Sequence, residues 1–276
     1  MPNALKSALE FYVDIGVDEC LQDEPANRIS ESQNPRIPEK AEANPVRSEI
    51  PRFGDSQILG KTQAQSQSVQ LAQSAQTLEE LRTAITDFDG ISLKKTATNL
   101  VFSDGNPQAH VMIIGEAPGA DEDRQGKPFV GVSGQLLDKI LRCIDLSRTA
   151  GEPEKSVYLT NILNWRPPGN RTPSPAEIAV SLPFIERHIQ LIKPKVIILC
   201  GGVSAKTMLG SGDSFSKLRK KFHDYTPQTP ELQENAAPIP AIATFHPIYL
   251  LSTPVQKRAV WQDMLMLQDK LKSVGS

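Results

Sequence analysis

Residues 110–119 read HVMIIGEAPG, and this stretch decides the fold class. Its first part, 110–115, is an apolar run rich in β-branched side chains, which is typical of a strand buried on both faces of a sheet. Its second part is a rigid Gly/Pro turn that brings backbone N–H groups close to a ligand. A buried strand that ends in such a turn indicates an α/β protein, whose ligand site lies beyond the carboxyl ends of the strands.

Similar strand patterns recur along the chain, separated by helical patterns. Further strands are predicted at 157–161, 196–200 and 241–245, with a short one at 99–102. Helices are predicted at 78–88, 133–144, 174–192, 204–209 and 255–271. This alternation predicts a three-layer αβα sandwich around a central, mainly parallel four-stranded sheet. In such a sheet the strand ends at 115–119, Asn161, 201–202 and His246 should converge on one crevice.

The first 75 residues differ in composition from the rest of the chain. Residues 1–21 have apolar side chains at helical spacing and predict an amphipathic helix, which either binds a protein partner or packs on its own domain. Residues 22–75 combine five prolines with a Gln/Ser tract. They bury too little apolar surface to offset chain entropy, which predicts a disordered linker. The globular domain is therefore expected to span 76–276.

Length and composition exclude several classes of protein. The chain has 276 residues, 39% hydrophobic residues and a net charge of −2, and the excess of acidic residues lies in its first 75 positions. No apolar run approaches the roughly 18–20 residues of a membrane helix, and the N-terminus does not resemble a secretory signal. Cys20, Cys143 and Cys200 are too far apart to suggest a disulfide framework or a metal-binding pair. These features predict a cytoplasmic protein without a membrane partner. We also expect it to be a monomer.

The first group of candidate site residues follows the strand at 110–115. Residues 115–123 read GEAPGADED, and 126–131 read GKPFVG. Acidic side chains in this turn would repel a phosphate. They suit a site that needs a carboxylate beside a developing cation or an attacking water. Taken alone, the motif is also compatible with an ordinary strand-to-helix turn.

Two further groups follow later strands. Residues 160–173 read TNILNWRPPGNRTP, in which the Asn161 amide offers a donor and an acceptor, and Arg166 and Arg171 suit phosphates. Residues 246–251 read HPIYLL, in which His246 is suited to donate to a developing anion and the apolar side chains to wedge into a base stack. Taken alone, Asn161 is also compatible with a turn cap, and His246 with a core histidine.

In this order and spacing, the three motifs resemble the uracil-DNA glycosylase superfamily, and family 4 most closely, over about residues 96–270. The resemblance implies a uracil-DNA glycosylase-like fold. It also implies a DNA repair enzyme that flips uracil out of single- or double-stranded DNA and hydrolyses its N-glycosidic bond. The product would be an abasic site, as in base excision repair.

The resemblance also implies roles for single residues. Asn161 would read the N3 and O4 edge of uracil, Phe129 would stack on the flipped base, and His246 would hydrogen-bond to O2. Glu116 and Glu122 would be catalytic together with Asn161 and His246, with Glu122 assisting hydrolysis. The turn residues Glu116, Ala117, Pro118 and Gly119 would contact the base and deoxyribose. Some sister families carry aspartate where Ala117 stands, so the water-activating group stays open. The implied DNA contacts are Arg166, Arg171, Tyr249, Leu250 and Leu251.

The chain departs from the family 4 pattern at the implied cofactor. Family 4 members are expected to hold an iron–sulfur cluster on four cysteines, whose positions here carry Phe88, Ile91, Trp165 and Ser181. None of these side chains supplies a thiolate. We therefore expect no cluster and no other metal, with hydrophobic packing in the place of the cluster. Ser252 also stands where many members have arginine, so the phosphate or wedge contact of that arginine is not implied for this chain.

Two alternatives to a catalytic glycosylase remain at this stage. One is a non-catalytic or covalently trapping relative that binds uracil-containing DNA. The trapping variant uses a histidine in an inserted loop, and residues 161–173 contain neither a histidine nor an insertion. The other is a small-nucleotide-binding α/β protein, but its glycine-rich GxGxxG or Walker motif does not occur.

Overall fold

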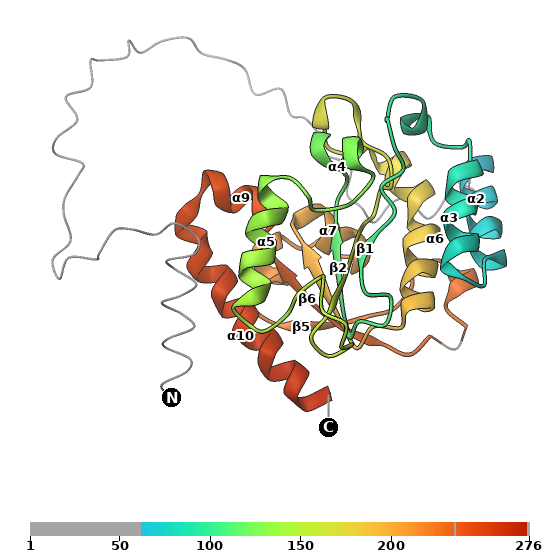
Figure 1. Ribbon diagram of the computed structural model, residues 1–276. Coiled ribbons are helices and arrows are strands. Elements are labelled where there is room, and N and C mark those ends of the chain that lie inside the picture. The colour runs from blue at the N-terminus through green and yellow to red at the C-terminus, as the bar shows by residue number, and fades with distance from the viewer. Residues whose placement is uncertain (1–61, 235, 275–276) are drawn as a thin grey trace, which may run out of the picture.

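The computed structural model describes residues 62–234 and 236–274. The predicted helix at 1–21 and residues 22–61 of the predicted linker lie outside this part. A six-stranded sheet in the order β1-β3-β2-β4-β6-β5 forms the middle layer (Figure 1). Its strands are β1 (Asp104–Gly105), β2 (Val111–Gly115), β3 (Val157–Asn161), β4 (Val196–Cys200), β5 (Phe222–Tyr225) and β6 (Ile239–Thr244).

Helices cover both faces of this sheet (Figure 1). The α-helices are α2 (Gln63–Ser74), α3 (Leu78–Asp87), α4 (Ala120–Gln125), α5 (Val132–Arg142), α6 (Pro175–Ile192), α7 (Gly202–Met208), α8 (Phe215–Leu218), α9 (Pro247–Ser252) and α10 (Lys257–Val274). Short 3-10 turns are η1 (Ser92–Lys95), η2 (Pro168–Asn170), η3 (Pro230–Leu232) and η4 (Pro254–Gln256). No helix of the described part is long and apolar enough to cross a membrane.

The four central strands, β3, β2, β4 and β6, run parallel, which confirms the predicted parallel sheet. The structure adds the antiparallel edge strands β1 and β5, which the sequence analysis missed. The strand predicted at 99–102 is wrong. The Val101 N–H donates instead to the carbonyl of Asn164, and pairing with β3 begins only at Asp104.

Side chains of the central strands alternate between two apolar layers. Met112 and Ile114 face the core under α3, α6 and α7, whereas Val111 and Ile113 face the core under α5 and α10. All five positions of β2, β3 and β4 are buried, which explains the continuous apolar runs of β2 and β4. In β3 the apolar run covers 157–159 and is followed by the buried polar residues Thr160 and Asn161. The predicted three-layer sandwich is confirmed.

The domain begins earlier than predicted, because α2 occupies positions assigned to a disordered linker. Thr62 caps this helix: its hydroxyl accepts from the Gln65 N–H, and the Gln65 side chain accepts from the Thr62 N–H. The helix lies against α6 (Figure 1), with Val69 and Ala72 buried. Tertiary packing therefore stabilises a segment whose Gln/Ser composition suggested disorder, and the prediction is wrong for 63–74.

One histidine belongs to the core rather than to the site. His188 of α6 is buried, its Nε2 lies 2.7 Å from the Tyr158 hydroxyl, and its ring stacks on Phe102. Burial lowers the pKa of His188 from 6.5 to about 3. The unfolded chain binds a proton there below pH 6.5 and the folded chain does not, so this residue should make the protein less stable as the pH falls from 6.5 towards 3.

Candidate active site

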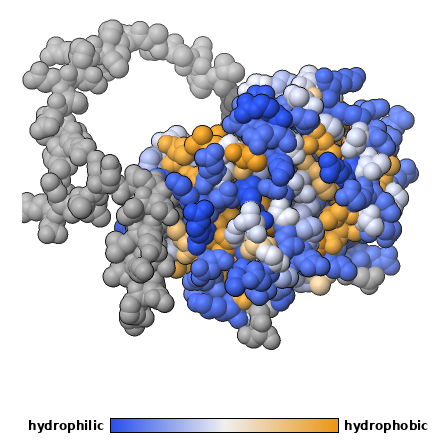
Figure 2. Space-filling model, in the orientation of Figure 1, coloured by the Kyte–Doolittle hydropathy of each residue, from blue (hydrophilic) through white to orange (hydrophobic). Residues whose placement is uncertain are grey.

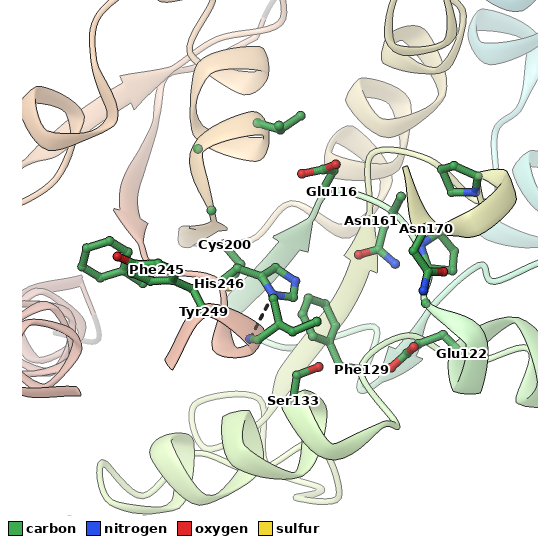
Figure 3. A pocket seen from close by; sticks show the side chains of 18 of the residues that line it. Glu116, Glu122, Phe129, Ser133, Asn161, Asn170, Cys200, Phe245, His246 and Tyr249 are labelled. Carbon is green, nitrogen blue, oxygen red and sulfur yellow. Dashed lines mark hydrogen bonds between the residues drawn. The ribbon is translucent and has the colours of Figure 1, made fainter. Parts of the chain in front are cut away.

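The carboxyl ends of the four parallel strands open into one cavity of about 570 Å³ (Figure 3). Glu116 follows β2, Asn161 ends β3, Gly201 follows β4, and His246 stands just beyond β6. This volume lies within the range of about 300–1,000 Å³ that is usual for small-ligand sites. The predicted convergence of these strand ends is confirmed.

Asn161 presents its amide to this cavity. The residue is only 3% exposed, and its side chain has no hydrogen-bond partner among the residues that the structure describes. Gly115 lies opposite on β2, where a Cβ atom would stand 2.3 Å from Asn161 Oδ1 and 2.8 Å from Phe129 Cζ. Glycine at this position therefore allows the amide and the aromatic ring to lie side by side.

Phe129 forms one wall of the cavity, in a loop that Glu122 anchors. Its ring stacks toward His246 with the centroids 5.8 Å apart (Figure 3). Glu122 Oε1 accepts from the N–H groups of Val130 at 3.0 Å and Gly131 at 2.9 Å. Glu122 was expected to assist the hydrolytic chemistry, and its anchoring of the loop, which uses one of its two oxygens, was not predicted.

His246 is held as a neutral hydrogen-bond donor. It caps α9, and its Nδ1 accepts from the Ile248 N–H at 3.3 Å, which leaves the ring hydrogen on Nε2. Burial lowers the pKa of His246 to about 4, although the charge of Glu122 opposes this shift. At neutral pH the ring is therefore uncharged, and its Nε2–H is available to a ligand in the cavity.

Glu116 contributes a carboxylate without a partner in the described part of the chain. It lines the cavity, and burial raises its pKa above the ordinary value of 4.5. The neighbouring residues Ala117, Pro118 and Gly119 line the same wall, as predicted from the turn. The carboxylate, the imidazole and the amide thus reach the cavity from three different strand ends (Figure 3).

The two predicted phosphate-binding arginines lie in the loop after β3. Arg171 lines the cavity and pairs with Glu177 at 2.6 Å, while its side chain stays 47% exposed. Arg166 does not line the cavity, and its Nε donates to the side chain of Asn170 at 2.8 Å. Arg171 is thus exposed at the cavity, whereas Arg166 is half-buried.

The predicted apolar contacts lie on α9 and differ in exposure. Tyr249 and Leu251 are exposed, but Leu250 is fully buried in the core, so the prediction that Leu250 contacts DNA is wrong. The first turn of α9 instead presents Ile248, which is 61% exposed and lines the cavity. Figure 2 shows apolar surface over α9.

Several lining residues were not found from the sequence. Phe245 directly precedes His246 and stacks on Tyr249, so its proximity to the third motif was a usable signal. Phe215 and Ser133 carried no such signal, because α8 and the start of α5 reach the cavity only through the tertiary fold. The other missed members are Pro167, Asn170, Cys200 and Val203.

The residues present do not fit an iron–sulfur cluster. Phe88, Ile91, Trp165 and Ser181 are all buried, and the Phe88 ring meets that of Phe184 edge to face, with centroids 5.4 Å apart. The free cysteines of the described part lie on the opposite face of the sheet, where Cys200 is buried in the core and Cys143 is half-buried against it. That part also contains no group of three metal-binding side chains.

Fold and site together define an α/β protein with a crevice suited to a planar base that has both a donor and an acceptor at its edge. The family model of the Uracil DNA glycosylase superfamily matches residues 102–265, and the chain belongs to this superfamily.

Curated relatives support the resemblance to family 4. The chain is 31% identical over 195 residues to the Type-4 uracil-DNA glycosylase of Sulfurisphaera tokodaii, covering 70% of this chain and 84% of the relative. It is 33% identical to that of Pyrobaculum aerophilum, covering 68% of this chain and 92% of the relative. It is 35% identical to that of Saccharolobus solfataricus, covering 66% and 80%.

Proposed function

We propose that the protein is a monofunctional glycosylase that hydrolyses the N-glycosidic bond of uracil in DNA and leaves an abasic site. The observation that carries this proposal is the unpartnered amide of Asn161, which lies beside Phe129 in a cavity that His246 also lines. Membership of the superfamily and the names of the Type-4 relatives support the same activity.

Base selection follows from the chemistry of the Asn161 amide. Uracil offers O4 as an acceptor and N3–H as a donor, and the amide nitrogen and oxygen match both. Cytosine reverses the two groups, so it meets two mismatched contacts. Each buried, unpaired polar group costs about 1–3 kcal/mol, and the pair of mismatches should therefore exclude cytosine. The base has to leave the helical stack to reach this site, and the Phe129 ring offers it a stacking surface.

Bond cleavage separates charge, and the cavity supplies a group for each sign. As the bond between C1′ and N1 breaks, uracil takes the electron pair and the sugar becomes oxocarbenium-like. The His246 Nε2–H donates to O2 of the uracil anion, and the Glu116 carboxylate stabilises the cationic sugar. Water then adds its hydroxyl to C1′, and its proton goes to the departing uracil.

DNA binding would place the exposed apolar side chains of α9 against the base stack. Ile248, Tyr249 and Leu251 are exposed at or near the mouth of the cavity, where a side chain can fill the gap left by a flipped nucleotide. Arg166 and Arg171 lie on the opposite side of the site and suit the flanking phosphates.

The protein would work without an iron–sulfur cluster. Phe88, Ile91 and Trp165 pack in the core at the positions where the family pattern expects thiolates. Iron analysis and a visible spectrum of the purified protein check this. Colourless protein without stoichiometric iron is the expected result, and about four irons per chain with charge-transfer absorbance would refute it.

A uracil-containing oligonucleotide tests the activity directly. Incubation followed by alkali should cleave the strand at the uracil, and matched strands with thymine or cytosine should stay intact. The variant His246→Ala serves as the inactive control. Binding without cleavage would favour the non-catalytic relative, and a covalent protein–DNA adduct would favour the trapping one.

A further inference from the structure

Phe129 lies in the loop of residues 128–131 and has a backbone conformation that this residue type rarely adopts. Its φ is +55°, in the left-handed region that favours glycine. The loop also lies tightly against the first turn of α5, where a Cβ atom at Gly134 would stand 1.9 Å from the Phe129 carbonyl oxygen. Surrounding groups must therefore hold the loop in place.

Arg148 holds the carbonyl groups of this loop. Its Nη2 donates to the Phe129 carbonyl at 2.8 Å, and its Nη1 donates to the Pro128 carbonyl at 3.2 Å. The Glu122 carboxylate holds the N–H groups of the next two residues. Two side chains of opposite charge thus bind one backbone group from each of the four residues 128–131.

The Arg148 guanidinium is itself fixed from two elements. Its Nε donates to Asp138 Oδ1 of α5 at 2.8 Å, and its Nη1 donates to Asp104 Oδ2 of β1 at 3.0 Å. The side chain is 12% exposed, so little water competes for these contacts. All three guanidinium nitrogens are used, which an ammonium group on a lysine stem cannot reproduce.

We propose that Arg148 is a positioning residue, which sets the angle and depth of the Phe129 ring in the base pocket. This inference rests on the proposed function. Arg148 does not line the cavity, so it acts on the base through the loop. The Phe129 ring and the Asn161 amide both lie against Gly115. A small movement of the loop therefore shifts the ring that stacks on the base relative to the amide that hydrogen-bonds to it.

Single-turnover excision of uracil by three variants tests this proposal. Arg148→Gln should lower the excision rate by about 10–10²-fold, the scale expected for a misplaced contact group. Affinity for the abasic product, which lacks a base to stack, should change less. Arg148→Lys should not restore the rate. Arg82→Gln, at an exposed arginine of α3, is the matched control and should behave like the wild type.

A double-mutant cycle with Phe129→Ala separates positioning from general destabilisation. If Arg148 acts through Phe129, the double variant should be no slower than Phe129→Ala alone. If the two substitutions instead lower the rate by independent factors that multiply in the double variant, the proposal is wrong. Should Arg148→Gln not fold, Asp138→Ala, which removes one anchor of the guanidinium, takes its place in the cycle with the same expectation. An inactive wild type would refute the proposed function, whereas an active wild type and an equally active Arg148→Gln would refute only this inference.

Discussion

Replacing Asn161 by aspartate changes the hydrogen-bonding groups at the pocket edge while keeping the size of the side chain. The amide is almost fully buried, has no partner in the described part of the chain, and lies against Gly115. It therefore has little room to move away from a bound base. An ionised carboxylate there still accepts from uracil N3–H, but it cannot donate to O4 and repels it.

The magnitude follows from the lost contact. One buried acceptor, uracil O4, is left unpaired at a cost of about 1–3 kcal/mol, and repulsion from the carboxylate adds to it. A total of about 3 kcal/mol corresponds to roughly a 10²-fold loss of uracil excision. Burial and the nearby Glu116 should raise the pKa of the new carboxyl group, so part of the activity should return as the pH is lowered.

Base preference gives a result that a folding defect does not produce. A protonated carboxyl group can donate from either oxygen, so it matches the pairing edges of both uracil and cytosine. Asn161→Asp should therefore excise cytosine slowly at low pH, where the wild type does not. Single-turnover rates on matched uracil and cytosine strands between pH 5 and pH 8 measure this. Unchanged uracil excision in Asn161→Asp at every pH would refute the assignment of the pocket.

Three further predictions concern the histidines and the tail. His246→Ala should lower the single-turnover rate by about 10²–10³-fold with a smaller loss of DNA affinity, and the wild-type rate should show no titration near pH 6.5, because the pKa of His246 is about 4. Lowering the pH from 7 to 5 should cost about 2 kcal/mol of unfolding free energy through His188, and urea titrations of His188→Gln should lack this part of the pH slope. Deleting residues 1–61 should leave excision unchanged, whereas deleting 1–75 removes α2 and should lower the free energy of unfolding by about 2–4 kcal/mol. An inactive but folded 62–276 chain would show that the tail completes the site.

Sequence patterns were most informative where burial alone determines the residue types. The bounds of β3 and β4 were predicted correctly. β4 is a continuous apolar run, as a strand buried on both faces requires, and β3 begins with one at 157–159. Edge strands such as β5, with the sequence FHDY, carry no such run. The helix α2 was missed because its stability comes from packing against α6 rather than from its Gln/Ser composition.

Site residues were predicted well at strand ends and less well elsewhere. Glu116, Asn161 and His246 stand at or just beyond strand ends, and the parallel sheet brings them together. Leu250 was assigned to the surface because the helical phase of α9 is not evident in the short motif HPIYLL. The roles of Glu122 and Arg148 depend on contacts with backbone groups of residues 128–131, and no spacing rule in the sequence reports such contacts.

Release of free uracil under multiple-turnover conditions tests the central claim most directly. Purified full-length protein is mixed with an excess of an oligonucleotide that carries one uracil, and free base and abasic DNA are quantified separately. Catalytic hydrolysis predicts several uracil molecules released per protein chain, with an equal amount of abasic strand. Release of no uracil by the folded protein, or of at most one equivalent that leaves the DNA covalently attached to it, would contradict the account.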